Sequence, residues 1–317
     1  MPEVRFLPLR PLALASLVAN VALVVTGAAV RLTGSGLGCP TWPRCTDTSY
    51  TTTAEMGVHG VIEFGNRLLT FALGIIAVAC VIAALLEKPR RRSRVLLALA
   101  VLLYIPLQAV VGGITVLTDL NPWVVGVHFL ISIVIIAFAY ALWRRAAEGD
   151  GPPVQLVPRP LRHLVWILST VSAAVIALGV VVTGSGPHAG DLDAKRNGLD
   201  PAAISQAHAD VVFLLLGLTL ALVFALRAVN APRATVRAAV VLLAVELAQG
   251  LIGFVQYFTH LPVLLVGAHM LGAALVWTST LAVIWSLRSR PDVPAAVEAP
   301  AEPSPTVAAE EPVPAPR

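Results

Sequence analysis

Long apolar runs separated by short polar segments dominate the pattern along this chain. About 20 apolar residues in a helix are enough to cross the roughly 30 Å hydrocarbon core of a bilayer. The runs lie near residues 12–30, 57–86, 95–117, 122–143, 162–183, 201–228, 235–257 and 262–287. The pattern therefore predicts eight membrane-spanning helices.

Basic residues fall almost entirely in every second connection between the runs and near the two chain ends. They are Arg5, Arg10, Lys88, Arg90, Arg91, Arg92, Arg94, Arg144, Arg145, Arg159, Arg162, Arg227, Arg233, Arg237, Arg288 and Arg290. Lys and Arg concentrate in the cytoplasmic loops of membrane proteins. We therefore expect a multi-pass membrane protein with both termini in the cytoplasm.

Two local patterns occur twice in the sequence. Residues 108–112 and His128 of the first half recur as residues 249–253 and His269 of the second, with Gln and Gly at the same distances from the His. The first apolar run follows basic residues and could be a cleaved signal peptide. However, its Val-Val-Thr-Gly segment at 24–27 recurs at 181–184, which favours a retained first helix.

This repetition predicts an all-α polytopic membrane protein made of two tandem four-helix bundles related by a pseudo-twofold axis. The expected parts are an N-terminal bundle at 1–147, a cytoplasmic linker at 148–160, a C-terminal bundle at 161–290 and a disordered cytoplasmic tail at 291–317. The linker is rich in Gly and Pro, so we expect it to carry no regular structure.

The composition agrees with residence in a lipid bilayer. Of 317 residues, 57% are apolar and only 13% are charged, and the mean hydropathy is +0.82. Soluble domains carry about 25% charged residues. No basic stripe interleaved with aromatic residues is present, so we expect no nucleic-acid partner.

Four of the seven histidines lie inside apolar runs, and all four are in even-numbered runs: His59, His128, His208 and His269. Helix starts are predicted at a capping box beginning with Thr52, at Asn121-Pro122, at Asp200-Pro201 and at Pro262. Counted from these starts at 1.5 Å per residue, each histidine lies about 10 to 12 Å into its helix. The four rings are thus expected in one layer.

A single histidine in a membrane helix is usually hydrogen-bonded to a neighbouring helix. Four at one depth, with two in each half, are better explained as pairs, because every polar ring in hydrocarbon needs a partner. Two imidazoles facing each other across a bundle can bind a haem iron from both sides. We therefore predict two haem sites with His59, His128, His208 and His269 as axial iron ligands.

The second run carries further polar groups on the face of His59. Glu63, Asn66 and Thr70 follow at helical spacing, and Arg67 lies beside them. A buried carboxylate next to a haem can accept protons or orient a substrate, so Glu63 is the predicted catalytic residue. An ion pair with Arg67, one turn away, is the alternative interpretation.

Other polar groups are less informative. Cys39 and Cys45 share a short loop and are predicted to form a disulfide, with two free thiols as the alternative. Glu246 could serve a proton path or bond to the neighbours of Gln249. His188 and His260 are expected on the surface, and Cys80 in the core.

Several segments together resemble haem A synthase. They are Thr33-Gly34-Ser35-Gly36, Gly38-Cys39-Pro40, Trp42-Pro43-Arg44-Cys45, Ile62-Glu63-Phe64-Gly65-Asn66-Arg67, His128-Phe129 and the later histidines. The resemblance implies a membrane oxidoreductase that converts the C8 methyl group of haem O to the formyl group of haem A. It also implies a b-type cofactor haem between His208 and His269, and a substrate haem in the N-terminal half.

The sequence departs from the family at one position. Many members have Glu-x-x-His-Arg on the second helix, whereas this chain has Asn66 before Arg67. Asparagine is a poor iron ligand, so we predict that His59 pairs with His128 instead. Asn66 and Arg67 are then neighbours of the substrate site.

The resemblance implies successive hydroxylations of one methyl group for cytochrome oxidase biogenesis, with haem O synthase and an electron donor as partners in the lipid bilayer. Two alternatives remain. A di-haem b-type electron-transfer subunit would bind two haems without modifying them. A tandem-repeat transporter would bind none.

Overall fold

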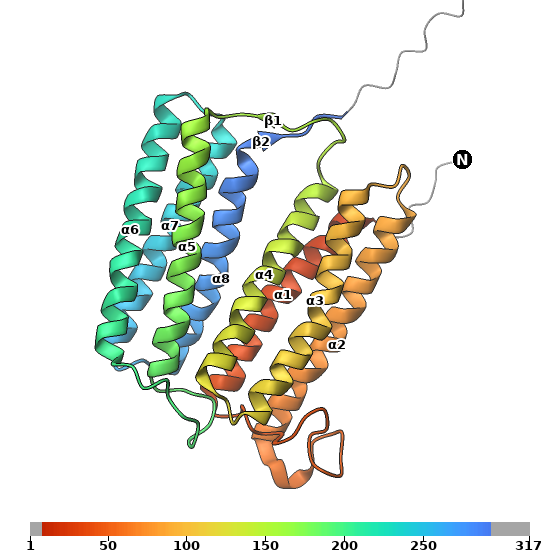
Figure 1. The fold of residues 1–317 in the computed structure, drawn as a ribbon, viewed down its shortest axis with the longest axis vertical. Helices are drawn as coiled ribbons and strands as arrows, with labels where there is room; N and C mark the ends of the chain where they lie inside the picture. Colours follow the sequence, from red (N-terminus) through yellow and green to blue (C-terminus); the bar gives the residue numbers. More distant parts are fainter. Residues whose placement is uncertain (1–7, 293–317) are drawn as a thin grey trace, which may run out of the picture.

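The computed structural model describes residues 8–292, and within them eight long helices (Figure 1). They are α1 (Leu9–Leu32), α2 (Gly57–Leu86), α3 (Arg92–Leu117), α4 (Pro122–Ala146), α5 (Arg159–Ser185), α6 (Pro201–Ala228), α7 (Arg233–Phe258) and α8 (Val263–Ser286). Each predicted run corresponds to one helix, and the ends agree to within three residues. All eight are long and apolar enough to cross a membrane. The prediction of an all-α polytopic membrane protein is confirmed.

The helices form two groups of four, α1 to α4 and α5 to α8, which we call the N-terminal and C-terminal halves (Figure 1). Helices α1 and α4 contact α8, and α4 also contacts α5, so these four helices join the halves. The indole Nε1 of Trp277 in α8 donates a hydrogen bond of 2.9 Å to the carbonyl oxygen of Ile133 in α4. This bond replaces a water contact that the hydrocarbon region cannot supply.

The two halves are packed with different side chains. Leucine fills the centre of the C-terminal half, where Leu168, Leu222 and Leu242 are completely buried. Alanine is common in the N-terminal half, where Ala77 and Ala98 are completely buried. Small residues let helix backbones approach closely in a membrane protein. Large apolar side chains on the outer helices, such as Phe71 and Leu251, are instead exposed, as expected for a surface in contact with lipid tails.

Helix starts agree with the predicted signals in two of four cases. The Asn121 side chain accepts a hydrogen bond from the Trp123 amide, and Asp200 accepts one from Ala202. Pro262 precedes the first residue of α8 instead of occupying it. The capping box at Thr52 is wrong, because Ala54–Met56 forms a 3₁₀ turn (η1) and α2 begins afterwards at Gly57. Gly57 has a φ of 55°, a conformation that interrupts the helix and suits glycine.

The linker between the halves is ordered, contrary to expectation. Its strand β1 (Val154–Gln155) pairs antiparallel with β2 (Arg288–Ser289), which directly follows α8. Glu148 at the start of the linker accepts hydrogen bonds from Arg145 at 2.6 Å and from the Trp285 indole at 2.7 Å. The pairing partner lies far away in the sequence, so the linker composition alone did not reveal it. Residues 293–317 of the predicted disordered tail lie outside the described part.

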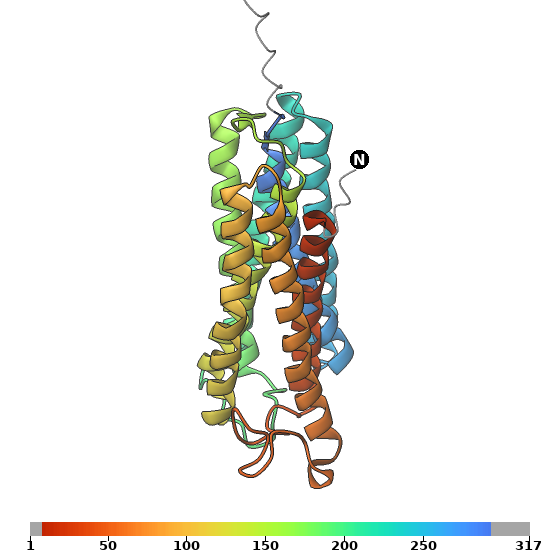
Figure 2. The same cartoon turned by 90° about the vertical axis from the view of Figure 1, so that its right-hand side faces the viewer.

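The two ends of the bundle carry different structures (Figure 2). The loop of residues 33–53, with both of its cysteines, and the loop of residues 186–200 lie together at one end, which we call the cysteine end. The strands β1 and β2 lie at the opposite end, which we call the strand end. The predicted histidine layer is closer to the cysteine end.

Candidate functional site

Three of the four predicted histidines share one arrangement. His128, His208 and His269 are the seventh, eighth and seventh residues of α4, α6 and α8, which places them about 10 Å from the cysteine end of each helix. Each ring is half-buried, and its Nδ1 atom is buried without a hydrogen-bond partner. Leaving a buried polar group unpaired costs about 1 to 3 kcal/mol. A ligand that used these nitrogens would remove that cost.

Each of these three rings lies against a glycine of the neighbouring helix. A methyl group added to Gly112, Gly179 or Gly253 would lie 3.1, 3.3 or 3.4 Å from the Cε1 atom of His128, His208 or His269 respectively. Any larger side chain would push the ring away. The glycines therefore set the position of the imidazoles, and they recur in both halves.

In the C-terminal half His208 of α6 and His269 of α8 lie at nearly the same depth from the start of their helices. No group of three or more His, Cys, Asp or Glu side chains in residues 8–292 is placed to hold a metal ion. A haem site needs fewer protein ligands, because the porphyrin supplies the in-plane ligands of the iron and the protein adds only the axial ones. The two imidazoles and their unpaired nitrogens fit that need.

The repeated glutamines have diverged in their contacts. Gln108 donates hydrogen bonds to the His128 carbonyl oxygen at 3.0 Å and to the Ser132 hydroxyl at 2.6 Å, and so fastens α3 to the histidine helix. Gln249 instead packs against Gly272 of α8, where an added methyl group would overlap the amide. Both glutamines link their helix to the next, one by hydrogen bonds and the other by close contact.

His59 differs from the other three histidines. It is the third residue of α2, so the expectation of equal depth is wrong for this residue. Its side chain is exposed, and its Nδ1 atom lies 2.9 Å from the Ser35 hydroxyl. It lines an open cavity of about 640 Å³ together with Met56 and Asp191. Its role as an iron ligand stays a prediction.

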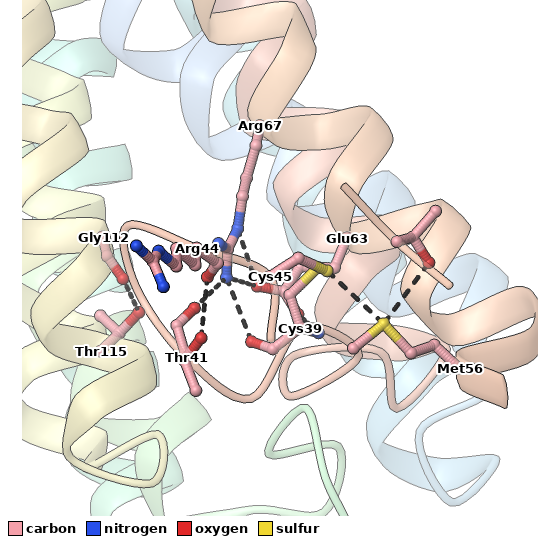
Figure 3. Close-up of polar contacts among 10 residues, drawn as sticks. Cys39, Thr41, Arg44, Cys45, Met56, Glu63, Arg67, Gly112 and Thr115 are labelled. Carbon is pink, nitrogen blue, oxygen red and sulfur yellow. Dashed lines mark hydrogen bonds and ion pairs between the residues drawn. A yellow bond between two sulfur atoms is a disulfide. The ribbon is translucent and has the colours of Figure 1, made fainter. Parts of the chain in front are cut away.

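The paired-cysteine loop is fastened to α2 through Glu63 and Arg67 (Figure 3). Cys39 and Cys45 form a disulfide, as predicted. The Cys39 amide donates a 2.5 Å hydrogen bond to Glu63, and Arg67 forms an ion pair with the same carboxylate at 2.5 Å. Arg67 also donates to the carbonyl oxygens of Cys39 and Thr41, both at 3.1 Å. The ion pair expected as the alternative for Glu63 is thus present, and a catalytic role stays a prediction.

The same loop also reaches α3 next to the histidine site. The Trp42 ring packs on Gly113 so closely that an added methyl group would lie 2.3 Å from a ring carbon. Gly112, the preceding residue, faces the His128 ring. The adjacent glycines of α3 therefore leave room for two rings. Gly113 leaves room for Trp42 of the loop, and Gly112 leaves room for His128.

The other predicted polar groups have separate places. Glu246 accepts a 2.9 Å hydrogen bond from Thr219 of α6, not from a neighbour of Gln249, and its second oxygen is unpaired. His188 bonds to the Leu261 carbonyl oxygen at 3.0 Å, so it holds two loops together. Cys80 is a buried free thiol, as expected.

Arg31 at the end of α1 has a structural role that the sequence patterns did not predict. Its guanidinium donates to the Thr183 carbonyl oxygen of α5 at 2.6 Å and also to the carbonyl oxygen of His188. It thus joins the two halves at the cysteine end. An arginine in the last turn of an apolar helix was the available signal, since a charge at this depth needs partners.

Comparisons with known proteins agree with this fold. A family model described as cytochrome oxidase assembly protein (COX15-CtaA) matches residues 10–281. The heme A synthase of Symbiobacterium thermophilum is 29% identical over 184 residues, which cover 55% of this chain and 58% of that protein. The heme A synthase of Listeria welshimeri is 30% identical over 136 residues, which cover 43% of this chain and 44% of that protein. The chain thus spans about half the length of these relatives.

Fold and site together define a multi-pass helical membrane protein with imidazoles held between its helices. The match to the family model covers most of the chain. The chain belongs to the family of cytochrome oxidase assembly proteins, and the resemblance to haem A synthases is confirmed.

Proposed function

We propose that this protein is a membrane oxidoreductase that converts haem O to haem A for cytochrome oxidase biogenesis. The observation that carries the proposal is the set of three half-buried imidazoles whose Nδ1 atoms are buried and unpaired, each facing a glycine of a neighbouring helix. Family membership and the name heme A synthase of its relatives support the same activity.

In this proposal the two halves have different tasks. His208 and His269 hold a b-type haem as a permanent cofactor, which supplies electron transfer when bound. His128 holds haem O as the substrate in the N-terminal half. Asn66 and Arg67 lie beside the substrate, and a second iron ligand at His59 stays a sequence-based prediction outside this proposal.

The reaction proceeds by two hydroxylations of the C8 methyl group, each of which consumes one dioxygen molecule, two protons and two electrons from the donor and releases one water molecule. The first gives an alcohol and the second a geminal diol, which loses water to leave the formyl group. Glu63 accepts a proton at this site, and Arg67 holds its carboxylate in place through the 2.5 Å ion pair. The disulfide loop, fastened to the same carboxylate, covers the site.

The protein spans a bacterial cell membrane with both termini in the cytoplasm and the cysteine end outside. An oxidising outer compartment is the one in which a disulfide such as Cys39–Cys45 persists. Basic residues such as Arg91, Arg94 and Arg288 lie at the strand end, as the positive-inside rule requires of the cytoplasmic side. Haem O synthase and an electron donor are the proposed partners.

Pigment extraction tests the function. The full chain is expressed in cells that make haem O and no haem A, and the extracted haems are separated and weighed by mass spectrometry. Haem A is expected only when the protein is present. Bound haem without any formyl product would favour a di-haem electron-transfer subunit, and a purified protein without pigment would favour a transporter.

A further inference from the structure

Helices α2 and α6 can be aligned by the residues that they bury. When the last residues of the two helices, Leu86 and Ala228, are matched, four of the buried positions of α2 coincide with four of the five buried positions of α6. The coincident pairs are Leu73 with Leu215, Ala77 with Thr219, Cys80 with Leu222, and Ala84 with Leu226, and every member is at most 4% exposed. The two helices therefore present the same face to their own bundles.

In this register Asn66 occupies the place of His208. His59 falls on Pro201, the first residue of α6, two turns before the ligand position. The contacts agree with this alignment. His208 packs against Gly179 of α5, and Asn66 faces the corresponding helix α1, where its Oδ1 atom accepts a 2.8 Å hydrogen bond from Thr26.

Asn66 occupies the ligand position but is chemically a poor iron ligand. An amide oxygen suits hard cations, whereas haem iron prefers imidazole, thiolate or thioether. The Asn66 oxygen is also already used by Thr26. His59 has an imidazole ring, which suits iron. However, that ring is exposed, lines the open cavity of about 640 Å³ and is hydrogen-bonded to Ser35.

His128 keeps every feature of the C-terminal ligands. Its Nδ1 atom is buried and unpaired, and its ring faces Gly112 as that of His269 faces Gly253. The ligand position of α4 in the N-terminal half is therefore filled by His128. The position that His208 occupies in the C-terminal half is occupied here by Asn66.

We infer that the N-terminal half binds haem through one protein ligand, His128, and leaves the opposite face of the iron open at Asn66 to a small external ligand. The inference rests on the proposed function and deepens it. A substrate has to leave after reaction, and a haem held through one iron bond is released more easily than one held through two. The cofactor haem of the C-terminal half, held by two histidines, stays in place.

Carbon monoxide binding to the full-length protein tests this inference. Detergent-solubilised protein is titrated with haemin until both slots are filled, reduced with dithionite and exposed to carbon monoxide. Optical and magnetic circular dichroism spectra are expected to show one low-spin haem that does not bind carbon monoxide and one high-spin haem that binds it. Two low-spin haems, neither of which binds carbon monoxide, would overturn the inference.

Two variants assign the ligands. Asn66→His restores the pattern of the other half, so carbon monoxide binding is expected to be lost and a second low-spin haem to appear. His59→Ala is expected to leave the spin state and carbon monoxide binding of the wild type unchanged. A wild type whose N-terminal haem is low-spin and becomes high-spin in His59→Ala would establish His59 as the ligand instead.

This experiment separates failure of the inference from failure of the proposed function. A protein that makes haem A and binds two low-spin haems contradicts only the open coordination site. A protein that binds no haem at saturating haemin contradicts both.

Discussion

The two halves of the molecule each bury one acidic side chain, and they do so in different ways. Glu63 of the N-terminal half pairs with Arg67 and accepts the Cys39 amide next to the disulfide loop. Glu246 of the C-terminal half has only the Thr219 hydroxyl, deep in its bundle. In the alignment of α2 with α6, Glu63 corresponds to Ser205, so the buried acid of the N-terminal half has no acidic counterpart in the C-terminal half.

In the proposed function the C-terminal half is the cofactor site, and the N-terminal half is the substrate site beneath the disulfide loop. Only the N-terminal half has a disulfide loop, among the described residues, and that loop contacts both the buried acid and the helix beside His128. The C-terminal counterpart, residues 186–200, has no cysteine. Variants at matched positions in the two halves test whether the halves differ in this way.

The largest effect is expected from the ligands of the C-terminal half. His269→Ala removes an axial iron ligand and should weaken binding of the cofactor haem by roughly 100-fold or more, beyond the loss seen when only a supporting residue is changed. The haem content per protein, measured as the pyridine haemochrome, checks this. His260→Ala, in the loop before α8, is the matched control and should retain full haem. Equal haem content in both variants would contradict the assignment.

Glu63→Gln is expected to have the next largest effect. Losing a proton acceptor in the reaction should lower the rate of haem A formation by about 100-fold to 10,000-fold. The assay is the haem O to haem A ratio in extracts from cells with equal amounts of protein.

Ser205→Ala, at the corresponding position of the other half, is the control for Glu63→Gln and should change the ratio little. Because Glu63 also holds the Cys39 amide, Glu63→Asp is a useful companion that keeps the charge. Undiminished haem A in Glu63→Gln would remove this residue from the chemistry.

The disulfide should contribute a smaller amount to stability. Opening a loop of this length, with six residues of separation between the cysteines, should cost about 2 kcal/mol by the chain-entropy relation. Cys39→Ser with Cys45→Ser should therefore lower the melting temperature of the purified protein. Wild-type protein in reductant should melt like the double variant, whereas the double variant should not respond to reductant. A response of the double variant would point to Cys80.

The smallest effect is expected at the glycines that face the histidines. Gly253→Ala should press on the His269 ring and reduce haem affinity modestly, because its methyl group would lie 3.4 Å from Cε1. Gly250→Ala, one turn earlier on α7 with open space around it, should instead stabilise the helix by up to about 1 kcal/mol. Thermal melts with and without haemin compare the two. If both variants gain stability and retain haem, the glycine does not position the ring.

The sequence predicted the helices well because their signal is local. An apolar run bounded by polar residues carries its own evidence of a membrane helix, and the caps at Asn121 and Asp200 are likewise contained within a few residues. The layer of His128, His208 and His269 followed from counting along those helices. The repeated Gln-to-Gly spacing also marked Gly112 and Gly253, although their contact with the rings was not foreseen.

The failures involve partners distant in the sequence or an unforeseen backbone turn. The 3₁₀ turn before Gly57 moved the start of α2 and with it the depth of His59. The bond from Cys39 to Glu63 and the pairing of β1 with β2 join segments that no local pattern connects. Deciding whether His59 or Asn66 corresponds to His208 required a comparison of the residues that α2 and α6 bury.

The pairing of β1 with β2 has a consequence for the connectivity of the C-terminal half. The chain enters α5 beside the point at which it leaves α8, because Gln155 and Arg288 are partners in the same two-stranded ladder. A unit whose entry and exit points meet tolerates circular permutation. The four helices of this half could therefore be cut at the loop between α6 and α7 and rejoined across the ladder without moving a helix.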